Sequence, residues 1–315
     1  SPGTRVGDGS VTATIVGKNG TTQAVTSVRV LPGGPYTVTA SLATADPLVV
    51  GSGRDMSVSV TDRYGNPVSD GTVVTLTTTL GAFQDGQGGS GSPLRTTTTG
   101  GVIHARYNAG TLAGIARIGA CAQSGRCTAF PATVLSGAPF GITTNLSRVE
   151  AQAGDEPLQV TVDVVDQFGN RVGNGEMVTL SVDNCPTALL QPTTAPTVDG
   201  RVSASLGVGT MPCQGVVHAD AGGRQAAPIP FRVTPADPQT LTVTAPPSLM
   251  ASGVQTGTVW ISLRDRFLNG IDSVVSLQLA PELGSLAQTE VQTVNGTGRT
   301  TLTSPRALGS AVLSA

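Results

Sequence analysis

The chain has 315 residues and a net charge of −2, with only 12% charged and 3% aromatic residues. This balance excludes the basic surface that nucleic acids and anionic lipids require. Abundant Gly, Pro, Thr and Ser, together with aliphatic residues for a core, indicate an all-β protein of two or three domains. No segment approaches the roughly 20 apolar residues of a membrane span. The chain starts at Ser1, so we expect a mature or excised piece of a larger product.

The first 34 residues are predicted to form the last two strands of a domain. Alternating segments run over Gly9–Ile15 and Gln23–Val30, with Asn19-Gly20 between them. Asn-Gly in this position is a strong signal for a hairpin turn. An isolated hairpin is only marginally stable in water, so we expect these strands to belong to a larger sheet.

Three later segments share one pattern: M-S-V-S-V-T-D-R-Y-G-N-P-V, V-T-V-D-V-V-D-Q-F-G-N-R-V and V-W-I-S-L-R-D-R-F-L-N-G-I. Their aspartates, Asp62, Asp166 and Asp265, are 104 and 99 residues apart. Apolar residues alternate before each aspartate, which predicts a half-buried strand of an antiparallel sheet. The positions expected to be buried are Val58, Val60, Val162, Val164, Ile261 and Leu263. Those expected to be exposed are Ser59, Thr161 and Ser262.

A turn and a second alternating strand follow each aspartate, and these strands begin at Val74, Val178 and Val275. Short linkers close at prolines with the same period, and a glycine is expected to open a later strand of each repeat. The prolines are Pro35, Pro139 and Pro238, and the glycines are Gly9, Gly114, Gly215 and Gly309. Repeats of about 100 residues with short strands predict tandem immunoglobulin-like β-sandwiches arranged as a rod. The predicted domains are 1–34 (the last strands of a preceding domain), 35–138, 139–237 and 238–315, the last of which lacks its final strand.

The segment D-R-Y-G-N-P-V-S-D-G-T-V-V-T-L-T, from Asp62 to Thr77, resembles the group 1 bacterial immunoglobulin-like domains of the invasin and intimin type. The second repeat departs from that pattern at Arg171, where the resemblance leads one to expect proline. The third departs more, because Leu268 replaces the glycine and no proline follows Asn269. The resemblance covers essentially the whole chain. It implies a spacer in a surface adhesin, with binding often placed in a terminal domain.

Four cysteines form two local pairs, Cys121 with Cys127 and Cys185 with Cys213. An even number of locally paired cysteines favours disulfides and an oxidising compartment. Free buried thiols or a metal site are the alternatives. A metal site is disfavoured because the spacing is not C-x-x-C and His218 is the only histidine nearby. We therefore predict disulfides, and no metal or cofactor.

The recurring aspartate and asparagine could serve a turn or a cation. The pairs are Asp62/Asn66, Asp166/Asn170 and Asp265/Asn269. Calcium needs six to eight oxygen ligands, and two side chains per turn fall short of that number. Side chains of this type commonly bond to the local backbone, so a turn motif is the preferred interpretation.

Four aromatic residues lie in or near the repeated motif. Tyr64, Phe168 and Phe267 occupy one position of each turn and are expected to plug the core between the sheets. Trp260 falls in the outward phase of its strand. An outward Trp predicts a contact surface, since exposed aromatic residues mark interfaces. Cover by a neighbouring loop is the alternative.

We expect no catalytic residues, because the two histidines, His104 and His218, lie in different repeats. The preferred function is an extracellular structural one, a stalk or filament at the cell surface. An adhesin with a binding face on one domain, or a non-catalytic module of a secreted enzyme, are the alternatives. The expected partners are copies of the chain, further repeats of it, or a ligand on a host or neighbouring cell.

The last predicted domain would expose an unpaired sheet edge. A longer covalent array would complete it, and so would a strand added from another subunit. The Gly9 strand duplicates the Gly309 strand, and this redundancy favours the longer array.

Overall fold

The computed structural model describes residues 3–279, 284–310 and 313–314. Every regular element among them is a β-strand. These residues pack into two compact units. The first runs to Ala138 and includes Val165–Gly173, and the second consists of Pro139–Val164 and the described residues from Asn174 onward. None of the described residues forms a helix of the length and apolarity that crossing a membrane requires.

The first unit begins with a separate hairpin of β1 (Gly7–Gly17) and β2 (Gly20–Val30). Gly17 pairs with Gly20, so the turn residues are Lys18 and Asn19 rather than Asn19 and Gly20. The predicted hairpin is therefore correct with its turn shifted by one residue. Both strands are exposed along their whole length.

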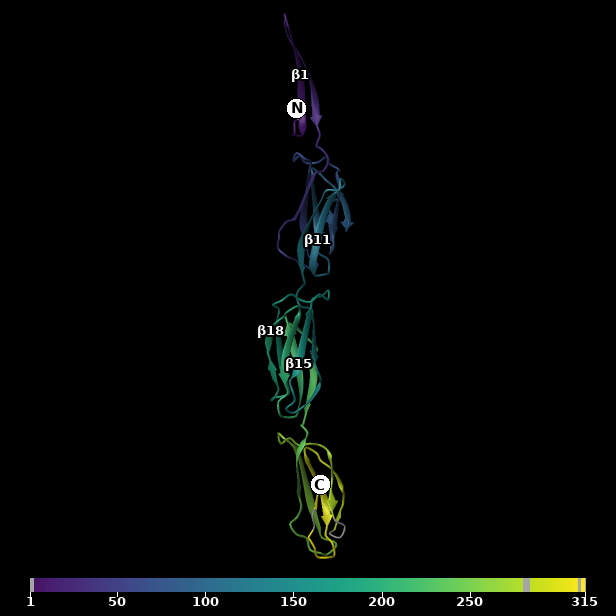
Figure 1. Ribbon diagram of the computed structural model, residues 1–315, viewed down its shortest axis with the longest axis vertical. Coiled ribbons are helices and arrows are strands. Elements are labelled where there is room, and N and C mark those ends of the chain that lie inside the picture. Colours follow the sequence, from purple (N-terminus) through teal and green to yellow (C-terminus); the bar gives the residue numbers. More distant parts are fainter. Residues whose placement is uncertain (1–2, 280–283, 311–312, 315) are drawn as a thin grey trace. The chain divides into compact units, whose positions relative to one another are not determined.

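The rest of the first unit contains a β-sandwich of two five-stranded sheets (Figure 1). One sheet has the order β3 (Thr37–Leu42), β5 (Gly53–Thr61), β10 (Val102–Asn108), β7 (Ala82–Asp85) and β8 (Ser90–Gly91). The other has the order β4 (Leu48–Val49), β12 (Cys127–Leu135), β11 (Gly114–Ala122), β6 (Val73–Thr78) and β9 (Leu94–Thr97). Aliphatic side chains from both inner faces form the core, with Phe83 and Tyr107 as its largest members. The sheets thus bury one face each, as the alternating pattern predicts.

The second unit contains two further sets of sheets. In the second sandwich, β13 (Gly141–Leu146), β15 (Leu158–Val165), β19 (Arg201–Gly207) and β17 (Leu189–Gln191) form one sheet. The facing sheet has the order β14 (Glu150–Gln152), β22 (Ile229–Thr234), β20 (Cys213–Ala221), β16 (Met177–Asp183) and β18 (Thr194–Pro196), and β21 (Arg224–Gln225) also pairs with β20.

The third sandwich has one four-stranded sheet and two short pairs. The sheet has the order β23 (Pro238–Thr244), β24 (Thr256–Asp265), β29 (Thr297–Thr303) and β27 (Ser285–Leu286). Opposite it lie the pairs β25 (Val274–Ser276) with β28 (Glu290–Gln292) and β26 (Gln278–Leu279) with β30 (Leu313–Ser314). Of the predicted strand Gly309–Ala315, residues 311, 312 and 315 lie outside the described residues.

The predicted inward residues are buried in all three repeats: Val58, Val60, Val162, Val164, Ile261 and Leu263. The prediction for the opposite face is only partly right, because Ser59, Thr161 and Ser262 are half-buried rather than exposed. The reason is their place in the sheet. β5, β15 and β24 each have a hydrogen-bonded strand on both sides, and the neighbours cover much of a small side chain.

The register of the last hairpins corrects one predicted equivalence. Gly114 pairs with Val134 and Gly7 pairs with Val30, so Gly7, rather than Gly9, corresponds to Gly114. Both of these glycines have a φ near +150°, which only glycine adopts readily. In the second sandwich the corresponding pair is Cys213 with Val233, so Gly215 also lies two residues further along its strand.

Candidate functional site

The recurring feature of the chain is the turn from an aspartate to the asparagine four residues later. We call Asp62–Asn66, Asp166–Asn170 and Asp265–Asn269 the first, second and third aspartate turns. Asp62 directly follows β5, Asp166 directly follows β15, and Asp265 is the last residue of β24. Each aspartate continues the inward phase of its strand. The three aspartates are consequently buried, with at most 3% of their surface exposed. A buried carboxylate has to be satisfied by hydrogen bonds, and its partners define the site.

One carboxylate oxygen organises the turn itself. Oδ1 of Asp62 accepts hydrogen bonds from the backbone N–H of Tyr64 at 2.8 Å and of Asn66 at 2.9 Å. The second and third turns repeat both bonds at 2.8–2.9 Å. This geometry is that of a turn stabilised by the aspartate side chain. No group of three or more potential metal-ligating side chains occurs among the described residues.

The other oxygen holds the linker that leads into the same repeat. Oδ2 accepts from the backbone N–H of Gly33, Gly137 and Ala236 at 3.0, 2.9 and 2.9 Å, respectively. Each of these donors lies 29 residues before its aspartate. The aspartate therefore fixes the linker as well as the turn, a role that the spacing did not predict.

The asparagine side chain contacts a third segment, which lies 62, 59 and 59 residues earlier in the chain in the first, second and third turns. Its Nδ2 donates to the carbonyl oxygen of Thr4, Thr111 and Thr210 in the first, second and third turns, each at 2.8 Å. In the first two turns the Oδ1 of the asparagine also accepts a backbone N–H, from Val6 at 3.4 Å and from Ala113 at 3.0 Å. Each of these contacts lies within a single compact unit.

The third turn has lost one of these bonds. Pro212 stands where the earlier repeats have Val6 and Ala113, and proline has no N–H to donate. The guanidinium of Arg266 donates instead to the carbonyl of Gly154 at 3.3 Å, and it lies 4.7 Å from the centroid of the Phe267 ring. A side-chain contact thus accompanies the weaker asparagine contact.

The aromatic residue of each turn is not a core plug, and that prediction is wrong. Tyr64 is 66% exposed and Phe168 is 39% exposed. The rings of Phe168 and Phe267 instead lie against backbone at Gly51 and Gly154. A Cβ at Gly154 would come within 2.5 Å of the Phe267 ring, so glycine is required for that approach. The side chain follows the aspartate by two residues and leaves the inward phase, which explains why it lies outside the core.

Gly51 and Gly154 contact the aspartate turns, and the sequence reasoning did not single them out. Both have left-handed backbone, with φ of 76° and 78°, and Gly253 repeats this at 73°. The N–H groups of Gly51, Gly154 and Gly253 donate to the carbonyls of Gly110, Gly209 and Pro305, respectively. Gly110 and Gly209 directly precede Thr111 and Thr210, the residues that the asparagines contact. The three left-handed glycines are 103 and 99 residues apart, which matches the spacing of the aspartates, and this was the available signal.

The hydrogen bonds shift the acidity of the aspartates. The pKa of Asp62 is lowered to about 2, chiefly by the side-chain hydrogen bond from Asn66. Burial alone raises the pKa of Asp166 and Asp265. The hydrogen bonds from the asparagine and from the linker N–H outweigh burial, and the pKa of both falls below its ordinary value. The turns therefore carry charged carboxylates at neutral pH.

The remaining predicted residues lie apart from these turns. Cys121–Cys127 is a disulfide across the β11–β12 hairpin, with Cα atoms 4.1 Å apart. Cys185–Cys213 is a disulfide between the loop after β16 and the start of β20, at 5.3 Å. Trp260 is 53% exposed, so no loop covers it.

The two histidines belong to different sandwiches. His104 is exposed on β10 of the first. His218, on β20 of the second, lies 3.3 Å from the Asp183 carboxylate on the neighbouring strand. The structure therefore does not bring the histidines together.

No protein-family model matches the chain, and no curated protein matches it by sequence. Solved structures do match. FdeC, an adhesin of Escherichia coli, is 17% identical with a TM-score of 0.54, over 89% of this chain and 92% of FdeC. Invasin, a bacterial integrin-binding protein, is 17% identical with a TM-score of 0.52, over 88% of this chain. The fold is that of the bacterial immunoglobulin-like domains. The immunoglobulin-like chain described here spans 56% of the invasin structure.

Proposed function

We propose that this chain is a structural segment of an extracellular surface protein, in which tandem immunoglobulin-like repeats form a stalk or filament. In this proposal the repeats are 35–138, 139–237 and 238–315, and 1–34 supplies the last strands of a preceding repeat. Its partners are further repeats of the same chain or copies of it. The proposed role is mechanical and requires no catalytic residue or cofactor.

The observation that carries the proposal is the threefold recurrence of the aspartate turn as a joint. Each turn binds its own linker through the carboxylate and the segment before that linker through the asparagine. A flexible linker would need neither contact. Each linker is bound by a buried carboxylate whose two oxygens are both hydrogen-bonded. This arrangement favours a function in which the linkers are held in one conformation.

An extracellular location is supported by the two disulfides, which persist in oxidising compartments. The two proteins of similar fold point in the same direction. FdeC is an adhesin and invasin is an integrin-binding protein. Labelling of intact cells with an antibody against this chain tests the location. Signal only after lysis would contradict it.

The joint is tested by the distance between spin labels at two exposed positions of the second unit, Leu189→Cys and Val294→Cys. We expect one narrow distance distribution, which Asn269→Ala broadens because it removes the bond to the Thr210 carbonyl. Asn174→Ala is the matched control, since Asn174 accepts a hydrogen bond from the Asp199 N–H within its own sandwich. An equally broad distribution with and without Asn269→Ala would contradict a stiffening role.

A second candidate function is adhesion through a face of the third sandwich. Trp260 is 53% exposed on β24, between Thr244 of β23 and Arg299 of β29. An exposed Trp on a sheet face with polar neighbours is typical of a binding surface. The test compares cell binding by the wild type and by Trp260→Ala, with Val294→Ala as the control for loss of an exposed apolar group. Equal binding by all three would exclude this face.

A further inference from the structure

The outward face of the β23–β24–β29 sheet places the only tryptophan of the chain beside an arginine. Trp260 of β24 lies directly opposite Arg299 of β29, so their Cβ atoms are about 5 Å apart. Both side chains are exposed. Among the described residues, the cations that lie over aromatic rings are Arg126, Arg224 and Arg266. The guanidinium of Arg299 therefore leaves the indole ring uncovered, and both groups are open to a ligand on one surface.

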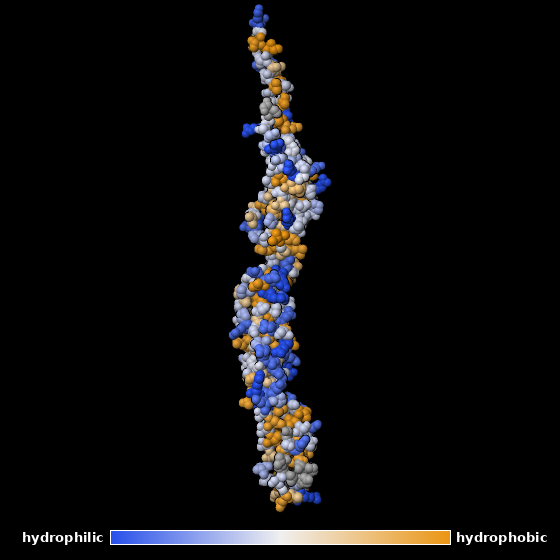
Figure 2. Space-filling model, in the orientation of Figure 1, coloured by the Kyte–Doolittle hydropathy of each residue, from blue (hydrophilic) through white to orange (hydrophobic). Residues whose placement is uncertain are grey.

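The corresponding positions of the other two sandwiches have neither an indole nor a guanidinium. In the first sandwich Ser57 lies opposite His104, and in the second Thr161 lies opposite Ser203. The side of the second sandwich that is in view in Figure 2 is mainly hydrophilic. The pair of Trp260 with an arginine is thus particular to the third sandwich, and the fold of the repeat does not require it.

Arginines on the same face of the first two sandwiches are matched by a carboxylate from the adjacent strand. Arg106 lies 3.4 Å from Asp55, and Arg201 lies 2.8 Å from Asp163. Both are directly opposite pairs in the register. Arg299 forms no ion pair with any residue that the structure describes. The third sandwich therefore carries an unmatched positive charge at this place.

The other charge on this face is positive as well. Arg264, in the same outward phase of β24, donates to the Leu268 carbonyl at 2.8 Å. The described carboxylates of the third sandwich lie elsewhere. Asp265 is buried at the end of β24, and Asp272 and Glu290 lie outside the strands of this sheet. A ligand on this face meets two cations and none of the described carboxylates, so charge complementarity selects an anion.

The surroundings of the pair favour a sugar over a protein partner. Protein interfaces of standard size bury about 800 Å² per partner around an apolar centre, whereas the outward phase of these strands offers one large apolar group. The C–H groups of a pyranose ring pack on the face of an indole ring. Threonine hydroxyls both donate and accept hydrogen bonds, as sugar hydroxyls do. The exposed threonines around the pair are Thr244, Thr258, Thr297 and Thr301.

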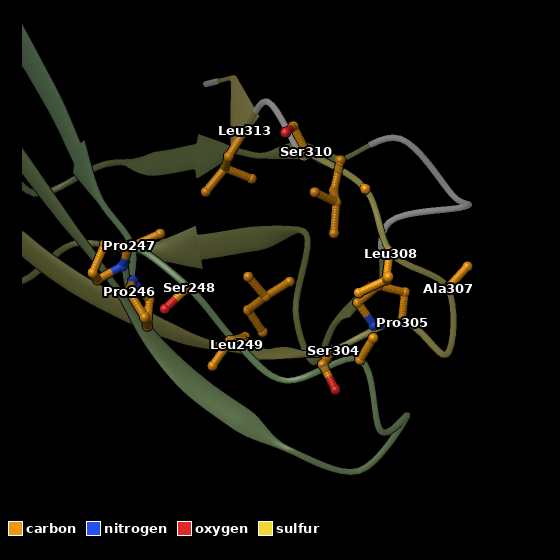
Figure 3. A pocket seen from close by; sticks show the side chains of 15 residues that line it. Pro246, Pro247, Ser248, Leu249, Ser304, Pro305, Ala307, Leu308, Ser310 and Leu313 are labelled. Atoms are coloured by element: carbon orange, nitrogen blue, oxygen red, sulfur yellow. The ribbon is translucent and has the colours of Figure 1, made fainter.

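The cavity of the third sandwich is not suited to the same ligand. It has a volume of about 410 Å³, and aliphatic residues, prolines and serines line it (Figure 3). None of the described lining residues carries a charge. A carboxylate bound there would have no cationic partner, and burial without one is costly. The outward face of the sheet is therefore the candidate site for an anion.

We propose that Trp260 and Arg299 bind an acidic sugar, a pyranose that bears a carboxylate, as in the uronic and sialic acid residues of glycans. The indole packs against the sugar ring. The guanidinium forms two parallel hydrogen bonds to the carboxylate, the geometry for which arginine is suited. The neighbouring threonines bind the sugar hydroxyls. This inference rests on the second candidate function, adhesion through this face, and adds the chemical class of the ligand.

Fluorescence of the 315-residue chain tests the proposal, because Trp260 is its only tryptophan. Titration with methyl glucuronide or a methyl sialoside at millimolar concentrations should change the emission. We expect an association constant about tenfold higher than for methyl glucoside, which lacks the carboxylate. The acidic sugar that binds more tightly identifies the source of the carboxylate. Added salt should weaken binding of the acidic sugars and leave the glucoside unaffected.

Two arginine variants distinguish the site from the overall charge. Arg299→Gln should lower the association constant for the acidic sugar about tenfold, to that of the glucoside. Arg117→Gln is the matched control, since it removes an exposed arginine from a strand of the first sandwich. By saturation-transfer NMR, Trp260→Ala should abolish binding, and Trp260→Phe should retain part of it because it keeps an aromatic ring. Circular dichroism verifies that the variants retain the sandwiches.

Several results would overturn the proposal: no binding of either acidic sugar, equal affinity for acidic and neutral sugars, or equal effects of the two arginine variants. Tighter binding of a polyglutamate peptide, lost in Arg299→Gln, would assign the face to an acidic protein instead. Cell binding that depends on Trp260 without sugar binding would overturn this inference and leave the adhesive face in place. Sugar binding without such cell binding would support the inference and contradict the adhesive function.

Discussion

The second aspartate turn makes a prediction that isolates the contact of one side chain. Asn170→Ala removes the bond to the Thr111 carbonyl at 2.8 Å, the bond from the Ala113 N–H at 3.0 Å, and the bond to the Asp166 carboxylate at 2.9 Å. A neutral hydrogen bond contributes about 1 kcal/mol net, and one to a charged group about 1.5–3 kcal/mol. Water replaces part of each bond because the asparagine is only half-buried. We therefore expect Asn170→Ala to lower the free energy of unfolding of the first unit by about 2 kcal/mol.

Hydrogen exchange at the Ala113 amide is the most direct assay. This N–H donates to Asn170, so the substitution should leave it to the solvent and raise its exchange rate roughly tenfold or more, since about 1.4 kcal/mol corresponds to a factor of ten. Asn174→Ala is the control, because it removes a bond to the Asp199 N–H and leaves Ala113 untouched. Unchanged exchange at Ala113 in Asn170→Ala would refute the contact.

Three further outcomes follow from the same geometry. The pKa of Asp62 is lowered to about 2, so its charged form stabilises the fold. The free energy of unfolding should therefore be level above about pH 5 and decline as the pH falls from about 4 towards 2. Asp62→Asn should flatten this decline. Gly154→Ala should lower the free energy of unfolding, measured with denaturant, by about 2 kcal/mol, since it strains a φ of 78° and displaces the Phe267 ring. Gly65→Ala is the control and should lower it by about 1 kcal/mol, because Gly65 has a similar φ of 81° but open space around it. Leu268→Gly should raise the thermal midpoint and stabilise by about 1 kcal/mol, because Leu268 holds a left-handed φ of 68°; a lower midpoint would contradict this.

The fold was predictable because its signals are local. Alternation around Val60, Val162 and Ile261 defines three strands without knowledge of their partners, and the side-chain period of two leaves one register that buries the apolar face. The short separation of Cys121 and Cys127 likewise predicts a hairpin. These inferences needed no contact between distant parts of the chain.

The joint was not predictable in the same way. The acceptor of Asn170 is the backbone carbonyl of Thr111, 59 residues earlier, and a carbonyl leaves no mark on the sequence. The aromatic residue of the turn was assigned to the core for a related reason. Phe168 is apolar and follows a buried strand, but its partner is the bare backbone at Gly51, and glycine is usually interpreted as a turn residue. Contacts between a side chain and backbone are thus the class that sequence patterns miss.

Backbone partners also explain how the joint survives when the repeats diverge. The third turn lacks the glycine and the proline of the first, yet Leu268 adopts a left-handed φ of 68° beside the 81° of Gly65. The Asn269 bond to the Thr210 carbonyl keeps its 2.8 Å length. Any residue supplies a backbone carbonyl, so the amino acid at position 210 can vary without loss of this bond. A proline two residues later, as at Pro212, removes the N–H that would donate to the asparagine. A contact that depends on one aspartate, one asparagine and backbone groups constrains few positions of each repeat, which is compatible with the proposed stalk of repeats that differ elsewhere in sequence.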